Sequence, residues 1–235
     1  MPIAPAPSSS TLASAGHRFD REGLAAFLRA GREPAWVSGL RQSGIEVLES
    51  LGLPDRHSEH WMRTDLRLFK PSAWALRAEP AGGALPAGLL AEAITSGESS
   101  SECFPDDSCR PSAATPLAGR FASLDGHVVT NELDPSLAAR GVRFGAAEEV
   151  LEQHEQELRP HWFGVIDSRC DYFAALHAAF HRASVVLYVP PRVRLVEPLH
   201  VLAAISAGGV DTSHVLVVLG EGAEATLLTE TAGGG

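Results

Sequence analysis

The sequence predicts an α+β protein whose helices precede its main run of strands. Apolar residues recur at helical spacing between residues 20 and 51, whereas the chain after residue 184 consists of short apolar, β-branched runs separated by Gly or Pro. Between these regions, residues 78–120 are rich in Gly, Pro, Ser and Ala. This order indicates a helical part and a strand-rich part that are joined by a linker or loop.

Two helices are predicted in the N-terminal part. Asp20 is a suitable N-cap for the first, and Gly31 is expected to end it. The second is expected to begin near Glu33, with Pro34 in its first turn, and to end at Gly52 in a left-handed conformation.

The same patterns divide the whole chain into five segments. They are a disordered tail at 1–16, an N-terminal helical domain at 17–77, a linker or loop at 78–120, a mixed helical segment at 121–183 and a strand-rich region at 184–235. Within the mixed segment, Asp125 and Gly126 lie between short apolar runs, which indicates a β-hairpin. Helices are expected at 145–162 and at about 170–181.

The strand-rich region contains several short apolar runs with Gly or Pro at the corners. Strands are expected at 184–189, 193–196, 199–205, 215–219 and 225–230. Because no helix is predicted between them, they suit a sandwich, a barrel or the coils of a parallel β-helix. Composition alone does not choose among these three.

Charge and cysteine content exclude several classes of protein. The formal net charge is −10, which argues against a nucleic-acid partner because the phosphate backbone repels an acidic chain. Three cysteines without dense spacing argue against a disulfide framework. The N-terminal residues lack the pattern of a secretory signal, and no apolar run reaches membrane-spanning length. We therefore expect a soluble cytoplasmic protein without a membrane partner.

The cysteines give only weak signals for chemistry. Cys103 and Cys109 lie in a polar loop, and their spacing is wider than that of typical zinc-binding pairs, so we interpret them as loop thiols. Cys170 begins a predicted amphipathic helix, whose N-terminus would lower the pKa of its thiol, although a small packed residue explains the position better.

Histidine spacing suggests two further candidate sites. His57 and His60 flank Glu59 and could bind a metal if this segment were helical, but a solvated polar turn fits better after Pro54. His177 and His181 are four residues apart on a predicted helix, which also permits shared ligation. Because His177 follows the apolar Leu176, we expect a hydrogen-bonded core histidine instead.

The acidic side chains also favour a structural interpretation. They alternate around one predicted helix and are typical of a solvated face: Glu148, Glu149, Glu152, Glu155 and Glu157. Neither a phosphate-binding glycine loop nor a hydrolase nucleophile elbow occurs. We accordingly predict no catalytic, cofactor-binding or metal-binding residue, and no enzymatic activity.

Three blocks of the sequence resemble the SufB/SufD family of iron–sulfur cluster assembly proteins. Residues 34–66 read PAWVSGLRQSGIEVLESLGLPDRHSEHWMRTDL, and residues 172–202 read YFAALHAAFHRASVVLYVPPRVRLVEPLHVL. The third block, at 214–230, reads HVLVVLGEGAEATLLTE. They follow the family order, and the Trp, Gly-x-Pro and Glu-x-Trp elements of the first block are similar to the SufD branch. One departure is His177, which stands where the family usually has Asn.

The resemblance implies a fold and a role. The fold would be an N-terminal helical domain followed by the first coils of a right-handed parallel β-helix, starting at 184–235 and apparently truncated. The role would be that of a non-catalytic SufD-like scaffold with SufB-like and SufC-like partners. In such a complex, SufC binds ATP and the assembled proteins handle the nascent iron–sulfur cluster, so this chain would bind no cofactor itself. The family's SufC-binding and SufB-pairing regions would follow residue 235, so we expect weak or no SufC binding by this chain.

Two alternatives remain at this point. A β-helix enzyme acting on polysaccharide would need carboxylates clustered on one face. After residue 184 the acidic residues fall mostly at predicted corners: Glu197, Asp211, Glu221, Glu224 and Glu230. A stand-alone cytosolic binding module is the second alternative. Because the sequence stops directly after a strand, where unpaired backbone edges need covering, we also expect a fragment or truncated reading frame.

Overall fold

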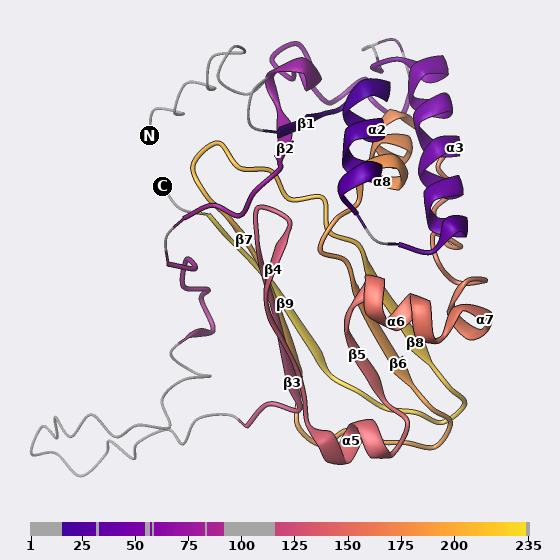
Figure 1. The fold of residues 1–235 in the computed structure, drawn as a ribbon, viewed down its shortest axis with the longest axis vertical. Coiled ribbons are helices and arrows are strands. Elements are labelled where there is room, and N and C mark those ends of the chain that lie inside the picture. The colour runs from indigo at the N-terminus through magenta and orange to yellow at the C-terminus, as the bar shows by residue number, and fades with distance from the viewer. Residues whose placement is uncertain are drawn as a thin grey trace, which may run out of the picture.

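The protein is α+β, with three helices gathered at one end and two sheets extending away from them (Figure 1). The computed structural model describes residues 16–31, 33–54, 57, 59–82, 84–91 and 116–233. The predicted tail at 1–16 lies outside these ranges except for Gly16, as does most of the predicted linker at 78–120. Among the described helices, none is both long and apolar enough to cross a bilayer.

The two N-terminal helices form where the sequence predicted them. Helix α2 spans Arg21–Ala30, and the Asp20 side chain accepts a hydrogen bond from the Gly23 N–H at 2.8 Å. Helix α3 spans Ala35–Leu51 and ends at Gly52, whose φ of 64° only glycine adopts without strain. The predicted capping residues therefore set the helix limits.

Helix α3 packs closely against α8, Tyr172–Phe180, from the later part of the chain. Gly44 permits this approach, because a Cβ added there would lie 2.9 Å from the backbone nitrogen of Ala179. The short strands β1, Gly16–Arg18, and β2, Ala75–Arg77, pair antiparallel beside α2. Three-residue strands carry too little periodicity to be predicted from sequence.

The predicted hairpin is confirmed. Strand β3 spans Gly119–Leu124 and pairs antiparallel with β4, His127–Leu133. Asp125 and Gly126 form the turn with φ values of 49° and 76°, as expected of the Asp-Gly pair in a two-residue hairpin turn.

The single helix predicted at 145–162 is wrong. Strand β5, Arg143–Ala146, occupies its start because it pairs antiparallel with a later strand. Two short helices follow it, α6 at Ala147–Gln153 and α7 at Glu155–Leu158, and the non-helical backbone of His154 separates them. The remaining short elements are α5, Pro135–Ala139, and the 3₁₀-helix η1, Pro71–Ala73.

The predicted strands after residue 184 form, apart from the run at 193–196. They are β6, Val185–Val189, β7, Leu199–Ile205, β8, Val215–Leu219, and β9, Leu227–Gly233. The run at 193–196 contributes only an isolated bridge between Arg194 and Glu224. It lies at a corner between two sheets rather than within one.

These four strands alternate between two sheets, with orders β4-β3-β7-β9 and β5-β6-β8. Strand β6 pairs parallel with β8, which places Val185 beside Val215. Strand β7 pairs parallel with β9, which places Leu199 beside Leu227. The chain thus passes twice through the same two sheets, as two stacked coils. Because these strands pair in parallel, they do not form an antiparallel sandwich or a closed antiparallel barrel.

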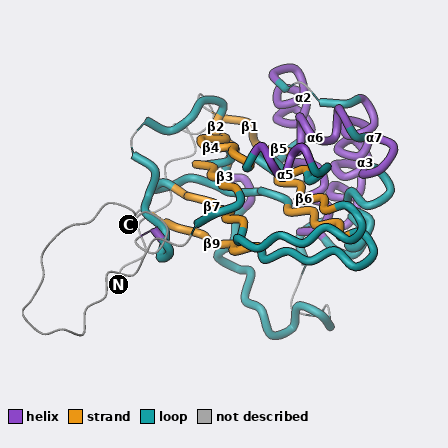
Figure 2. The backbone as a smooth tube through the Cα atoms, turned by 90° about the horizontal axis from the view of Figure 1, so that it is seen from below, coloured by secondary structure: helices purple, strands orange, loops and turns teal. Residues whose placement is uncertain are grey.

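The two sheets lie beside each other, as the view along the strands shows (Figure 2). Side chains from both meet in one apolar core, which includes Phe121, Val185, Leu187, Leu199 and Val201. A second core fills the space among α2, α3 and α8, and a third lies between α6, α7 and the outer face of β6 and β8.

Candidate functional site

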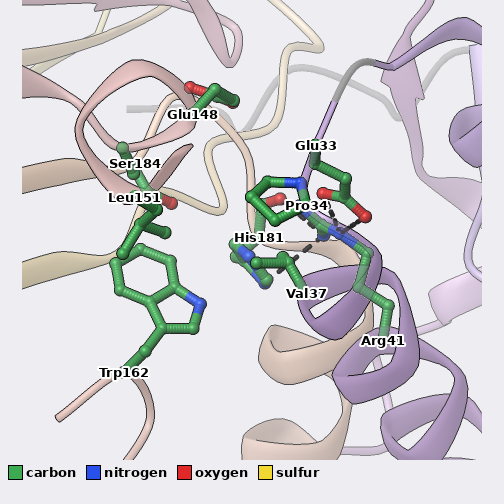
Figure 3. A pocket seen from close by; sticks show the side chains of 10 residues that line it. Glu33, Pro34, Val37, Arg41, Glu148, Leu151, Trp162, His181 and Ser184 are labelled. Carbon is green, nitrogen blue, oxygen red and sulfur yellow. Dashed lines mark hydrogen bonds and ion pairs between the residues drawn. The ribbon is translucent and has the colours of Figure 1, made fainter. Parts of the chain in front are cut away.

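A buried polar group lies where α3 meets the end of α8, beside the start of the sheets. Arg41 on α3 is almost fully buried and forms an ion pair with Glu33, with 2.8 Å between Nε and Oε2 (Figure 3). Their side chains are only 3% and 11% exposed. A buried charge is tolerated when it is paired and hydrogen-bonded, and Arg41 meets both conditions.

Arg41 also binds the C-terminal end of α8. Its Nη1 donates hydrogen bonds to the carbonyl oxygens of Ala179, at 3.2 Å, and His181, at 2.8 Å. The last carbonyls of a helix lack partners within the helix and carry partial negative charge. A single guanidinium therefore links the start of α3, the end of α8 and the chain that enters β6. Burial lowers the pKa of Arg41 and the Glu33 carboxylate opposes this shift, so Arg41 stays charged at neutral pH.

His181 completes this group as a neutral ring. Its Nδ1 lies 3.1 Å from the Ala178 carbonyl oxygen and 3.3 Å from Arg41 Nη1. Burial, followed by the nearby charge of Arg41, holds the pKa of His181 well below its ordinary value. Because the ring is uncharged, it does not repel the guanidinium. We call Arg41, Glu33 and His181 the junction cluster.

The junction cluster borders a cavity of about 10 Å³, which is room for about one water molecule. Trp162 and Ser184 line it on the far side (Figure 3). Trp162 Nε1 is buried and has no hydrogen-bond partner among the described residues. The space is too small for a substrate. The arrangement is instead suited to holding α3 and the end of α8 in a fixed orientation.

A second group of aromatic rings lies close to the first. His214 stacks on Phe163 with 4.2 Å between ring centroids, and His177 lies 5.2 Å from His214. Burial lowers the pKa of His177, and burial with the neighbouring His177 lowers that of His214 to about 4. These rings border a cavity of about 350 Å³ whose other walls are mainly apolar.

The rings of His177 and His181 both lie against Phe163, at 5.1 Å and 4.9 Å between centroids, but they make different polar contacts. His177 Nε2 lies 3.1 Å from the carbonyl oxygen of Ser213, in agreement with the predicted hydrogen-bonded histidine, although its ring is only partly buried. His181 instead faces Arg41. His57, Glu59 and His60 are exposed, in agreement with a solvated turn. Within the described ranges, no three His, Cys, Asp or Glu side chains gather as a metal site would require.

The cysteines and the acidic run take different positions. Cys103 and Cys109 lie outside the described residues, and Cys170 is exposed, which disagrees with the packed position expected for it. The acidic residues at 148–157 lie on α6 and α7 and are exposed or half-buried, as expected of a solvated face. Glu148 differs from the others because it lines the small cavity beside Arg41.

Sequence reasoning missed the junction cluster and a second buried polar group around Asp125. This hairpin residue is fully buried, and its carboxylate accepts hydrogen bonds from the backbone N–H of Ser206 at 2.9 Å and from its hydroxyl at 2.6 Å. It also forms an ion pair with Arg77 of β2, with 2.9 Å between Nε and Oδ2. The partners are far apart in sequence, so only the turn preference of Asp-Gly was visible.

Comparison with known proteins gives partial matches of one kind. No protein-family model matches the sequence. Over 83 residues the chain is 34% identical to the iron–sulfur cluster assembly protein SufB of Bacillus subtilis, a match that covers 35% of this chain and 18% of that protein. Over 108 residues it is 28% identical to an iron–sulfur cluster assembly SufBD family protein of Staphylococcus epidermidis, covering 46% of this chain and 23% of the relative. A SufBD family protein of Staphylococcus aureus is 26% identical over 108 residues.

The chain is similar to SufB and SufBD family proteins over 83 to 108 residues, which confirms the predicted resemblance to the SufB/SufD family. A match of 108 residues is too short to include all three sequence blocks, which extend from residue 34 to residue 230. The chain matches only about a fifth of the length of these SufB and SufBD relatives, 18% of the first and 23% of the second. The matches name SufB and the joint SufBD family, and they do not separate the SufD branch from SufB.

Proposed function

We propose that this chain is a SufD-like scaffold subunit that supports iron–sulfur cluster assembly and has no catalytic activity of its own. The observation that carries the proposal is the winding of β6 to β9 into two parallel coils, in a chain whose relatives are named for iron–sulfur cluster assembly. We interpret these coils as the start of a right-handed parallel β-helix.

Packing supports a rigid scaffold. Coils stacked in parallel bury ladders of apolar side chains, and Val185, Leu187 and Leu199 are at most 1% exposed. Each such side chain contributes about 1.5–3 kcal/mol when it is fully buried. The junction cluster adds polar links between α3 and the end of α8, from which the chain continues into β6. A rod joined firmly to a helical domain can transmit a rigid-body rotation between partners.

The proposed partners follow from the family relationship. A SufB-like subunit would pair with the β-helix, and a SufC-like ATPase would supply nucleotide-driven motion. The nascent cluster would be cargo of the assembled complex in the cytoplasm, and ATP would belong to the SufC-like subunit. The carbohydrate-enzyme alternative gains no support from the carboxylates, because Glu224 pairs with Arg194 and Glu230 with His200.

The function is tested by deleting the coding sequence from the native host. We expect the activity of an iron–sulfur dehydratase such as aconitase to fall under iron limitation, while the amount of its polypeptide stays constant. A dehydrogenase without a cluster is the control and should keep its activity. Expression of the deleted coding sequence from a plasmid should restore the dehydratase. Unchanged dehydratase activity in the deletion strain would contradict the proposal.

A further inference from the structure

A cavity of about 350 Å³ lies between α8, β8 and the segment at 161–166 that precedes α8. We call it the histidine cavity, because His161, His177 and His214 form part of its wall. All of the residues that line it belong to the described part of the chain. Sites for small ligands usually have volumes of about 300–1,000 Å³, so this space has the size of a ligand site.

The wall of the histidine cavity is held in place by backbone hydrogen bonds and aromatic packing. The His161 N–H donates to the Leu158 carbonyl oxygen at 3.0 Å, and the Gly164 N–H donates to that of His161 at 3.0 Å. Phe163 has a φ of 53°, which is uncommon outside glycine and persists where packing fixes it. Its ring stacks on that of His214, with 4.2 Å between centroids. The cavity is therefore largely formed before any ligand binds.

The wall of the cavity is uncharged. Among the described residues that line it, there is no Asp, Glu, Lys or Arg. Burial lowers the pKa of His177 and of His214, the latter to about 4, so both rings are neutral near pH 7. An ion that entered this space would lose its hydration without gaining a counter-charge from the wall. The wall therefore favours an uncharged ligand.

One imidazole in the wall is available for hydrogen bonding. His177 Nε2 already lies 3.1 Å from the Ser213 carbonyl oxygen. The backbone N–H of His214 donates to Ser184 Oγ at 3.2 Å, whereas its ring nitrogens have no hydrogen-bond partner among the described residues. A neutral imidazole has one donor and one acceptor nitrogen. His214 is therefore able to bind one polar group of a ligand whose remainder contacts apolar side chains.

We propose that the histidine cavity binds an uncharged, mainly apolar small molecule that carries one hydrogen-bonding group. The apolar part of the ligand would contact Ile166, Val215 and Val217, and its polar group would form a hydrogen bond with a ring nitrogen of His214. Apolar contact provides most of the affinity in such a site, and the polar group determines the orientation of the ligand. The site involves no iron–sulfur chemistry, so the proposal goes beyond the scaffold role and does not depend on it.

An added peptide strand is the main competing occupant, because β8 forms one edge of its sheet. Such a strand would follow the whole of β8, Val215–Leu219. The cavity instead borders β8 only from Val215 to Val217 and extends to Ala174 and His177 of α8. This shape fits a compact molecule better than an extended chain.

The test titrates the whole chain with three probes of nearly the same shape: 2-naphthol, naphthalene and the 2-naphthoate anion. Amide chemical shifts give the dissociation constants and map the contact. We expect 2-naphthol to bind about tenfold more tightly than 2-naphthoate, because the anion would lose its hydration in the cavity. It should bind about threefold more tightly than naphthalene, which has no polar group for His214. The shifted amides should lie at 161–166, 174–177 and 214–217.

Matched variants locate the contact. Ile166→Glu, at a side chain that is 63% exposed, places a charge at the cavity wall and should weaken 2-naphthol binding about tenfold. Val196→Glu makes the same kind of change at an 84% exposed position outside the cavity and should leave binding unchanged. His214→Phe keeps an aromatic ring beside Phe163 and should bind 2-naphthol and naphthalene equally.

Several results would overturn the proposal. They are equal affinity for 2-naphthol and 2-naphthoate, shifts confined to other residues, and no binding of any of the three probes. The same effect of Ile166→Glu and Val196→Glu, or a preference for 2-naphthol over naphthalene that persists in His214→Phe, would also contradict it. If a Val-rich extended peptide protected the β8 amides from exchange while 2-naphthol did not bind, the occupant would be an added strand and the proposal would be wrong.

Discussion

Replacing Arg41 by Ala should destabilise the protein more than any exposed charge substitution. The variant leaves the Glu33 carboxylate, only 11% exposed, without its cation. It also removes the donor to the Ala179 and His181 carbonyls at the end of α8. Ser38 Oγ still donates to Glu33 at 2.9 Å, so the carboxylate keeps one hydrogen bond.

The expected loss is about 3–5 kcal/mol, the usual effect of removing one member of a buried ion pair. The variant Arg41→Met with Glu33→Gln should lose less, because no buried charge is then left unpaired. The loss in the single variant thus reports the unpaired Glu33 as well as the lost bonds. We expect α3 and α8 to separate from β6 before the stacked coils unfold.

Urea denaturation followed by circular dichroism provides the measurement, with amide exchange to locate the change. Arg21→Ala is the matched control, because Arg21 pairs with Glu49 on the surface with side chains 61% and 47% exposed. That substitution should change the free energy of unfolding by less than about 1 kcal/mol. If Arg41→Ala and Arg21→Ala have the same effect, the reasoning about the junction cluster is wrong.

Three further predictions concern single positions. The pKa values of His181 and His214 lie below their usual 6.5, with that of His214 at about 4, so the unfolded chain binds protons that the native state does not. The stability that His214 contributes is present above pH 6.5 and is lost as the pH falls toward its native pKa of about 4, by up to about 1.4 kcal/mol per pH unit. The lowered pKa of His181 adds to this loss below pH 6.5. Urea midpoints that stay constant from pH 7 to pH 5 would contradict this. In α3, Gly44→Ala should lower the free energy of unfolding by about 1–3 kcal/mol, because its Cβ would meet α8. Gly39→Ala has open space around it and should raise the free energy of unfolding by about 1 kcal/mol. Thermal melts that shift both variants in the same direction would contradict this prediction. Gly88→Ala should displace the Glu230 carboxylate, with which its Cβ would clash, and so break the hydrogen bond that this carboxylate accepts from the Leu90 N–H at 3.2 Å. Exchange of the Leu90 amide should accelerate at least tenfold relative to the Gly82→Ala control, and equal exchange rates would argue against this contact.

The elements predicted correctly from the sequence are those whose limits depend on residues close together in the chain. Asp20 begins α2, and Gly31 and Gly52 end α2 and α3, because each of them acts on backbone groups within a few residues of itself. The apolar runs that became β6, β7 and β8 were visible for the same reason. By contrast, the last two residues of β5 were predicted as helix, because the conformation of this strand depends on pairing with β6, about forty residues later.

The contacts of the junction cluster could not be predicted from the sequence for a related reason. Arg41 and His181 are 140 residues apart in sequence, so no local pattern connects them. A single Arg within an amphipathic helix is normally expected on the solvated face. The one available signal was its place on α3 between apolar residues, together with Glu33 near the start of the helix. The outer-face pair of His200 and Glu230, with 2.7 Å between Nε2 and Oε1, was hidden in the same way.

The central structural claim is that β7 and β9 are neighbouring rungs of a parallel stack, and engineered disulfides test it most directly. With the three native cysteines replaced by Ser, Ala203→Cys with Thr231→Cys joins register partners, whereas Ala203→Cys with Thr229→Cys joins positions two residues out of register. A disulfide forms without distortion only when the two Cα atoms are closer than about 7 Å. The account predicts rapid, nearly complete oxidation of the first pair and little of the second. Equal or preferred oxidation of the second pair would contradict the stacked parallel coils.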